Sequence, residues 1–157
     1  MIDFERILHP TDCSPHADLA LRYACGLTEQ FGAELHLLHV VPDAAVIDAG
    51  GALGGYLPPQ DWLDSLVKAS KEQLAKIPER GWAANKHIVR ATVQGIVFLE
   101  IIRYAEEHAI DLIVVGTHGR SGLAHMLMGS VAEKIVRQAP CPVMTIRPEE
   151  HRSAVSR

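Results

Sequence analysis

Short, nearly continuous runs of apolar residues alternate along the chain with longer segments in which apolar residues recur every three or four positions. Runs of Val, Ile and Leu are typical of strands covered on both faces, and the longer spacing is typical of amphipathic helices. The predicted strands are residues 6–10, 34–41, 87–93, 111–116 and 141–147. A helical segment separates each strand from the next.

Capping residues mark the limits of the first predicted helix. Ser14 is its expected N-cap, Pro15 occupies the first turn, and Gly32 follows the last turn. Its apolar stripe consists of Ala17, Ala20, Leu21, Ala24, Leu27 and Phe31.

Three further helices are expected over about 61–77, 96–109 and from residue 130 onward. The inward residues of the second are Leu63, Leu66, Val67, Leu74 and Ile77, with Pro78 and Gly81 ending it. Ser130 and Glu133 have the spacing of a capping box, and the fourth helix should stop before Pro140.

This order of elements predicts an α/β fold in a single domain. Right-handed crossovers turn it into an open, parallel five-stranded sheet with helices on both faces, as in Rossmann-like proteins. Such sheets bind ligands beyond the carboxyl ends of the strands, where the strand order reverses. The domain should span residues 1–147, followed by a polar tail over 148–157.

Residues 43–59 are rich in Gly and Pro and have no clear periodicity. They are too long for an ordinary connection between a strand and a helix. A surface insertion is the simplest interpretation, and a lid or partner-docking loop is the alternative.

Composition and charge exclude several classes of protein. The 157 residues include 48% hydrophobic and 22% charged residues, which is ordinary for a globular domain. The net charge of −4 and scattered Lys and Arg residues argue against nucleic acid as a partner. No stretch is long and apolar enough for a membrane span, and the N-terminus lacks the apolar core of a secretory signal. We expect a cytoplasmic protein.

Cysteine and histidine show no metal-binding pattern. Cys13, Cys25 and Cys141 are widely spaced and are expected to be small buried hydrophobic residues. The nine histidines form no H-x-x-x-H or H-E-x-x-H pattern, so we expect no structural metal. His9 and His39 fall in predicted strands, as core or rim residues.

The stretch from Gly116 to Ser130 has the ingredients of an anion-binding loop. Glycines allow main-chain N–H groups to approach a phosphate, and the first turn of the following helix adds a positive dipole end. The possible side-chain donors are Thr117, His118, Arg120, Ser121 and Ser130. Neither G-x-x-x-x-G-K-[ST] nor G-x-G-x-x-G is present, and a tight loop with an ordinary helix cap would explain Gly129 and Ser130 equally well.

The spacing Gly116-x2-Gly119-x9-Gly129-Ser130, followed by VAEKIVRQAPCPVMTIR, resembles the universal stress protein family, in the branch with the ATP-binding signature G-x2-G-x9-G-[ST]. The segments ILHPTDCSPHA and LLHVV extend the resemblance, which covers nearly all of residues 3–147. It implies a sheet like that of the adenine-nucleotide α-hydrolases, and ATP as the ligand, with Mg²⁺.

The resemblance also implies a set of binding residues. Asp12 matches the acidic residue near the adenosine, with Pro10 and Thr11 beside it, and Val40 matches the residue that contacts the base. Gly116, Gly119, Gly129 and Ser130 match the ribose and phosphate positions, and His118, Arg120 and Val131 lie in the same loops. On the residues alone, Asp12 could be only a turn former and Val40 only a core residue.

Two features concern the surface. The segment Gly95-Ile96-Val97-Phe98 is more apolar than the family pattern, which would tilt the third helix or cover a partner surface. The last strand, 141–147, is expected at an edge of the sheet, and in the resembled family this strand commonly forms a two-fold dimer interface, so a homodimer is predicted.

The sequence contains no clear set of catalytic residues. The phosphate loop has no lysine, and no paired carboxylates have metal-binding spacing, so Mg²⁺ would arrive with the nucleotide. The favoured interpretation is an ATP-binding, homodimeric regulatory module of the stress response, with at most slow hydrolysis and an unidentified protein partner. The alternatives are an adenylyl-transferring enzyme, whose S-G-G-x-D-S and H-I-G-H motifs are absent, and a structural dimer without ATP.

Overall fold

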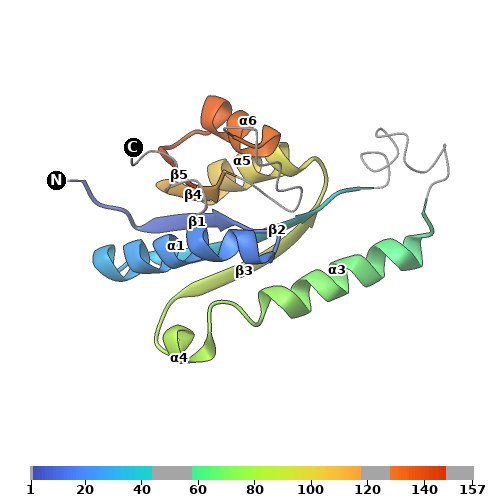
Figure 1. Ribbon diagram of the computed structural model, residues 1–157, viewed down its shortest axis with the longest axis horizontal. Coiled ribbons are helices and arrows are strands. Elements are labelled where there is room, and N and C mark those ends of the chain that lie inside the picture. Colours follow the sequence, from blue (N-terminus) through green and yellow to red (C-terminus); the bar gives the residue numbers. More distant parts are fainter. Residues whose placement is uncertain (1, 44–57, 118–127, 148–157) are drawn as a thin grey trace, which may run out of the picture.

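The computed structural model describes residues 2–43, 58–117 and 128–147 (Figure 1). The glycine-rich stretch between 118 and 127, most of the predicted insertion and the predicted tail lie outside these residues. The strands are β1 (Arg6–Pro10), β2 (Glu34–Val41), β3 (Ile88–Gln94), β4 (Leu112–Gly116) and β5 (Val143–Ile146). They form one parallel sheet in the order β3-β2-β1-β4-β5. The predicted sheet is confirmed, with β5 at one edge.

Helices cover both faces of this sheet (Figure 1). They are α1 (Asp18–Phe31), preceded by the 3-10 turn η1 (Pro15–Ala17), α3 (Gln60–Leu74), α4 (Arg80–Ala83), α5 (Val97–Glu107) and α6 (Ser130–Gln138). Figure 1 places α1 and α3 on one side, and α5 and α6 on the other. Consecutive residues of a strand point to opposite faces, so each strand needs apolar residues in an unbroken run.

The core therefore consists of two parts. Ile7 belongs to the part beneath α1 and α3, and the next residue, Leu8, belongs to the part beneath α5 and α6. Ile101 of α5 and Ile135 of α6 are at most 2% exposed against the second part. The alternation explains why the apolar runs of the sequence carry no two-residue period.

The two predicted serine caps are wrong, although the helices begin close to where they were expected. Ser14 precedes a 3-10 turn rather than α1, and its side chain makes no capping hydrogen bond. Its main-chain N–H instead donates to Asp12 Oδ1 at 2.9 Å. The predicted C-terminal glycine is confirmed, because Gly32 has φ 66° and ends α1 in a left-handed conformation.

At the fourth helix, Gly129 is the N-cap and Ser130 is the first helical residue. The Glu133 N–H donates to the Gly129 carbonyl at 3.0 Å, and the Glu133 carboxylate pairs with Arg137 at 3.0 Å. The capping box is absent because the main chain becomes helical one residue too early for Ser130 to act as the cap.

The second predicted helix ends at Leu74, not at residue 77, and is followed by the short helix α4, which the sequence pattern did not predict. Leu63 and Leu74 are its buried apolar residues, whereas the remaining predicted inward positions are only half-buried.

The third helix begins at Val97, directly after Gly95 and Ile96. Gly95 is buried with φ 149°, and a Cβ at this position would lie 2.8 Å from the Cγ of Glu100. Glycine is therefore needed for both the backbone conformation and the close approach of this side chain. Ile96 and Leu99 are 42% and 44% exposed, so the apolar start of α5 lies partly on the surface.

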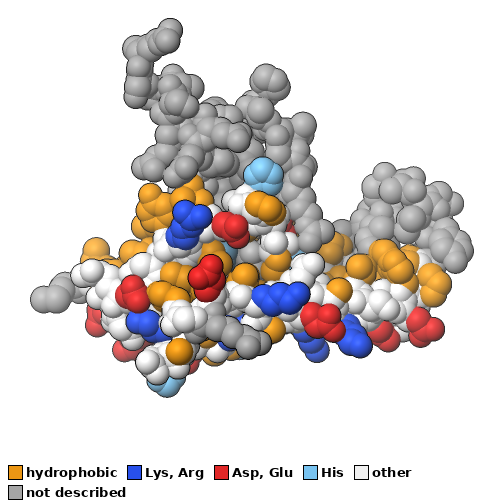
Figure 2. Space-filling view, turned by 60° about the horizontal axis from the view of Figure 1, so that its bottom comes forward, with side chains coloured by type: hydrophobic (Ala, Val, Ile, Leu, Met, Phe, Trp, Pro, Cys, Tyr) orange, Lys and Arg blue, Asp and Glu red, His pale blue; other side chains and the backbone are white. Residues whose placement is uncertain are grey.

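On the face drawn in Figure 2, basic and acidic side chains are interspersed. Cys13, Cys25 and Cys141 form no disulfide and are half-buried rather than fully buried, so the predicted burial is only partial. Burial raises the pKa of Cys25 to about 11, which keeps this side chain a thiol at neutral pH. No helix among the described residues is long and apolar enough to cross a membrane.

Candidate functional site

The strand order reverses at β1, because β2 lies on one side of it and β4 lies on the other. Connections from the two strands leave in opposite directions at such a point, so a crevice forms beyond their carboxyl ends. A cavity of about 440 Å³ occupies this place. Its volume falls within the range of small-molecule sites.

Four separate segments of the predicted site meet at this cavity. The predicted residues that line it are Pro10, Thr11, Asp12, Val40, Gly116, Gly129, Ser130 and Val131. The other three, His118, Gly119 and Arg120, lie outside the described residues. The structure adds lining residues that the sequence did not predict for the site, including His39, Val97 and Ile101. Thr117, predicted as a possible side-chain donor of the anion-binding loop, also lines the cavity. The helix pattern placed Val97 and Ile101 in α5, but only the tertiary structure directs them toward the cavity.

The turn after β1 forms one wall and is held by its own side chains. Thr11 Oγ1 accepts the Cys13 N–H at 3.0 Å, and Asp12 Oδ1 accepts the Ser14 N–H at 2.9 Å. Cys13 has φ 57°, a conformation that non-glycine residues seldom adopt. Asp12 is thus the turn former that the alternative interpretation expected, and it also lines the cavity.

The opposite wall joins the end of β4 to the start of α6. The Gly129 N–H donates to the Thr117 carbonyl at 2.6 Å, and the Thr117 N–H donates to the Ile146 carbonyl at 2.9 Å. Ser130 and Val131 lie in the first turn of α6, where main-chain N–H groups have no partner within the helix. This end of the cavity therefore attracts negative charge.

The interior of the cavity is largely apolar. Leu38 and Val40 of β2, Val97 and Ile101 of α5, and Val115 of β4 line it. Val40 is 8% exposed and belongs to the core beneath α5 and α6, so it is both a core residue and a lining residue. The cavity thus combines an apolar slot, a carboxylate and a helix N-terminus.

Comparison with known proteins decides the family. Residues 3–147 match the profile of the universal stress protein family. The chain belongs to this family. The universal stress protein YxiE of Bacillus subtilis is 34% identical over 148 residues, which cover 92% of this chain and 99% of YxiE.

Solved structures of other universal stress proteins share the fold. The protein MJ0577 of Methanocaldococcus jannaschii superposes with a TM-score of 0.79 and 25% identity, covering 94% of this chain and 99% of that one. A family member from Arabidopsis thaliana, solved with AMP bound, has a TM-score of 0.63 and 18% identity, with 97% of each chain covered. At 18% identity, the similarity to the Arabidopsis protein shows a shared fold and nothing more.

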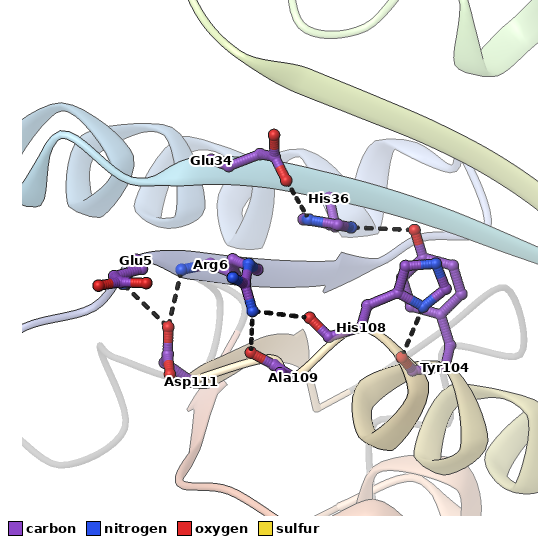
Figure 3. Close-up of polar contacts among 8 residues, drawn as sticks. All are labelled: Glu5, Arg6, Glu34, His36, Tyr104, His108, Ala109 and Asp111. Carbon is purple, nitrogen blue, oxygen red and sulfur yellow. Dashed lines mark hydrogen bonds and ion pairs between the residues drawn. The ribbon is translucent and has the colours of Figure 1, made fainter.

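A polar network lies at the other end of the sheet of this universal stress protein, where the strands begin (Figure 3). His36 is 3% exposed, and burial lowers its pKa, so its imidazole is neutral at pH 7. Its Nε2–H donates to Glu34 Oε1 at 2.8 Å, and the Tyr104 hydroxyl donates to its Nδ1 at 2.9 Å. The ring of His108 stacks on Tyr104 with 3.8 Å between centroids.

The network ends in main-chain contacts. Arg6 donates to the carbonyls of His108 and Ala109, at 3.3 and 3.2 Å, and Asp111 Oδ2 accepts the N–H groups of Glu5 and Arg6 (Figure 3). These bonds hold the C-terminal end of α5 against the beginnings of β1 and β2. Burial raises the pKa of Tyr104 to about 12, which disfavours a tyrosinate nucleophile. We therefore interpret the carboxylate, imidazole and hydroxyl as a structural network.

Histidine and carboxylate side chains form no metal-ligand set in the part of the chain that the structure describes. Within residues 2–43, 58–117 and 128–147, no group of three or more His, Cys, Asp or Glu side chains is placed to hold a metal ion. The cavity at the end of β1 and β4 is therefore the candidate site.

Proposed function

We propose that this protein binds ATP in the cavity beyond β1 and β4 and acts as a nucleotide-dependent regulatory module of the stress response. One observation carries the proposal: residues expected at an adenine-nucleotide site, from four segments far apart in the sequence, line a single cavity of about 440 Å³. The family assignment supports a role in stress.

The chemistry of the cavity fits the parts of an adenine nucleotide. The apolar slot beside Val40 and Val115 suits the base, and the Asp12 carboxylate suits the ribose hydroxyls. The first turn of α6, at Ser130, suits the phosphate chain. The AMP bound to the Arabidopsis protein shows that a protein of this fold accommodates an adenine nucleotide.

Mg²⁺ would enter with the nucleotide, because hard cations of this size keep most of their water and bind phosphate oxygens. Asp12 is the only carboxylate among the described lining residues, and it already accepts the Ser14 N–H. Hydrolysis needs a group placed to activate water, and this carboxylate is already hydrogen-bonded to the main chain. We therefore expect slow turnover. We assign the protein to the cytoplasm.

A homodimer through β5 is the second part of the proposal. Among the described strands, β5 pairs with β4 alone. All four of its residues are half-buried in the single chain, so apolar surface of Val143, Met144 and Ile146 remains exposed at this edge. An unpaired apolar edge strand favours pairing with a second copy.

The test begins with freshly purified protein, denatured and analysed by mass spectrometry for released nucleotide. Stripped protein is then titrated with ATP by calorimetry, with and without Mg²⁺, and compared with the Gly129→Val variant. ATP recovered from the protein, or micromolar affinity lost in the variant, supports the proposal. Native protein that neither retains nor binds ATP contradicts it, and substrate-dependent pyrophosphate release would favour adenylyl transfer instead.

A further inference from the structure

A proline occupies the last position of β1, in the middle of the sheet. In this segment, the main-chain groups of odd-numbered residues point toward β2, and the Thr11 N–H, for example, donates to the Leu38 carbonyl. The main-chain groups of even-numbered residues point toward β4, and the Arg6 carbonyl, for example, accepts the Asp111 N–H. Pro10 therefore faces β4, but it has no N–H to donate.

The ladder between β1 and β4 gives the Val114 carbonyl no main-chain donor, because Pro10 has no N–H. Leu8 pairs with Ile113 in the ladder between β1 and β4. Two residues further along β1, any residue at position 10 that had a main-chain N–H would donate it to the Val114 carbonyl. Buried carbonyls rarely lack a partner, so another group is needed here.

The imidazole of His9 supplies this bond. Its Nδ1 lies 2.8 Å from the Val114 carbonyl, and the side chain is fully buried. Burial lowers the pKa of His9 to about 4, so the ring is neutral at pH 7 and carries one proton. Because a carbonyl only accepts, that proton is on Nδ1. The Nε2 atom is buried and has no hydrogen-bond partner among the described residues.

A second imidazole makes the corresponding bond on the other side of β1. The His39 Nδ1 donates to the Thr11 carbonyl at 2.8 Å, one residue beyond the end of β1. His39 is 8% exposed, and the Thr11 N–H bonds back to Leu38 at 2.9 Å. The turn that carries Asp12 is thus attached to β2 by one main-chain and one side-chain bond.

We propose that His9 and His39 are positioning residues of the nucleotide site, whose imidazoles bridge β1 to β4 and β2 where the main-chain ladder ends. This inference rests on the proposed function. A continuous main-chain ladder holds neighbouring strands about 4.8 Å apart. The hydrogen bond from the His9 side chain to the Val114 carbonyl joins β1 to β4 without imposing this spacing. The crevice between the ends of the two strands therefore stays open.

Matched substitutions test the role of each imidazole. Asn places an amide N–H close to the position of Nδ1, whereas Leu fills the volume without a donor. His9 does not line the cavity, so its variants change the wall and not a ligand contact. With ATP and Mg²⁺ as the probe, we expect His9→Leu to weaken binding about tenfold and His9→Asn by less than about threefold. The pair at His39 should follow the same order, although His39 lines the cavity and its variants also change the lining.

Pro10 lines the cavity, so Pro10→Ala in the His9→Leu background separates positioning from stability only in comparison with Pro10→Ala alone, which carries the same change of lining. The alanine restores a main-chain donor to Val114, so the urea midpoint lost in His9→Leu should recover. ATP affinity should stay low, because the restored ladder draws β1 and β4 together. Recovery of affinity together with stability would overturn the proposal that the imidazole keeps the crevice open.

A measurement without nucleotide distinguishes this inference from the proposed function. In ¹⁵N NMR spectra of the native protein, His9 and His39 should carry slowly exchanging protons on Nδ1. In His39→Leu, the Cys13 and Ser14 amides should exchange faster. If these hold while native protein ignores ATP, the bridges stand and the proposed function fails. Protons on Nε2, or native ATP affinity in both Leu variants, would overturn the inference even if a variant folds poorly.

Discussion

The main-chain N–H of Gly129 lies 2.6 Å from the carbonyl oxygen of Thr117. This bond joins the end of β4 to the first turn of α6 across the segment between them. A Cβ on residue 129 would lie only 3.0 Å from the same oxygen. The wall of the cavity that attracts negative charge therefore depends on a residue without a side chain.

Gly129→Ala should weaken ATP binding about threefold to tenfold, because Thr117 and the α6 N-terminus must move apart by a few tenths of an ångström. Calorimetric titration measures this change. The matched control is Gly26→Ala in α1, where a Cβ meets nothing within 4 Å. The control should leave ATP affinity unchanged and increase the free energy of unfolding by about 0.5–1 kcal/mol. Equal affinities in the two variants would contradict the assignment of this wall.

Tyr104→Phe tests the polar network at the other end of the sheet. The substitution removes the hydroxyl that donates to His36 Nδ1 and leaves this buried nitrogen without its partner. We expect the free energy of unfolding to fall by about 1–3 kcal/mol, measured by urea denaturation. Tyr23, which is 39% exposed, provides the control, and Tyr23→Phe should change stability by less than about 0.5 kcal/mol. ATP affinity should be the same in both.

Acid should destabilise the protein through His9. Its pKa is lowered from 6.5 to about 4 by burial, so between these pH values the unfolded chain binds a proton that the folded chain does not. Stability is therefore fully present above pH 6.5 and decreases as the pH falls toward 4, by up to about 3 kcal/mol. Urea denaturation at several pH values should show that the free energy of unfolding falls less steeply with decreasing pH in His9→Asn than in native protein. Parallel curves for the two proteins would show that His9 does not titrate in this way.

Thr145→Pro tests the proposed dimer. The even-numbered residues of β5 bond to β4, as the Ile146 carbonyl does with Thr117, so the N–H of Thr145 faces away from the sheet. Proline removes this donor without breaking the bonds to β4, and edge strands accept it. Sedimentation equilibrium should give a dimer for native protein and for Thr145→Val, and a monomer for Thr145→Pro. A monomeric native protein would rule out the interface.

Local sequence patterns predicted the elements well where a single segment contains the whole signal. The apolar runs located all five strands to within two residues, because a strand covered on both faces needs apolar residues throughout. Gly32 marked the end of α1 because its left-handed conformation strongly favours glycine. The resemblance added the candidate site, and eight of its residues line one cavity.

Local main-chain geometry decided the caps, which composition alone does not specify. The Ser14 N–H donates to Asp12, two residues earlier, and Ser130 is the first residue of α6 rather than its cap. Tertiary structure decided the features that depend on two distant segments. His36 and Tyr104 are 68 positions apart and meet only because α5 packs across β2. Pro10 has no N–H for the Val114 carbonyl, and the His9 side chain donates to it instead. This relationship is visible only once the register of β1 and β4 is known. Periodicity and capping specify a segment by itself, whereas hydrogen bonds between segments depend on how strands align and helices pack.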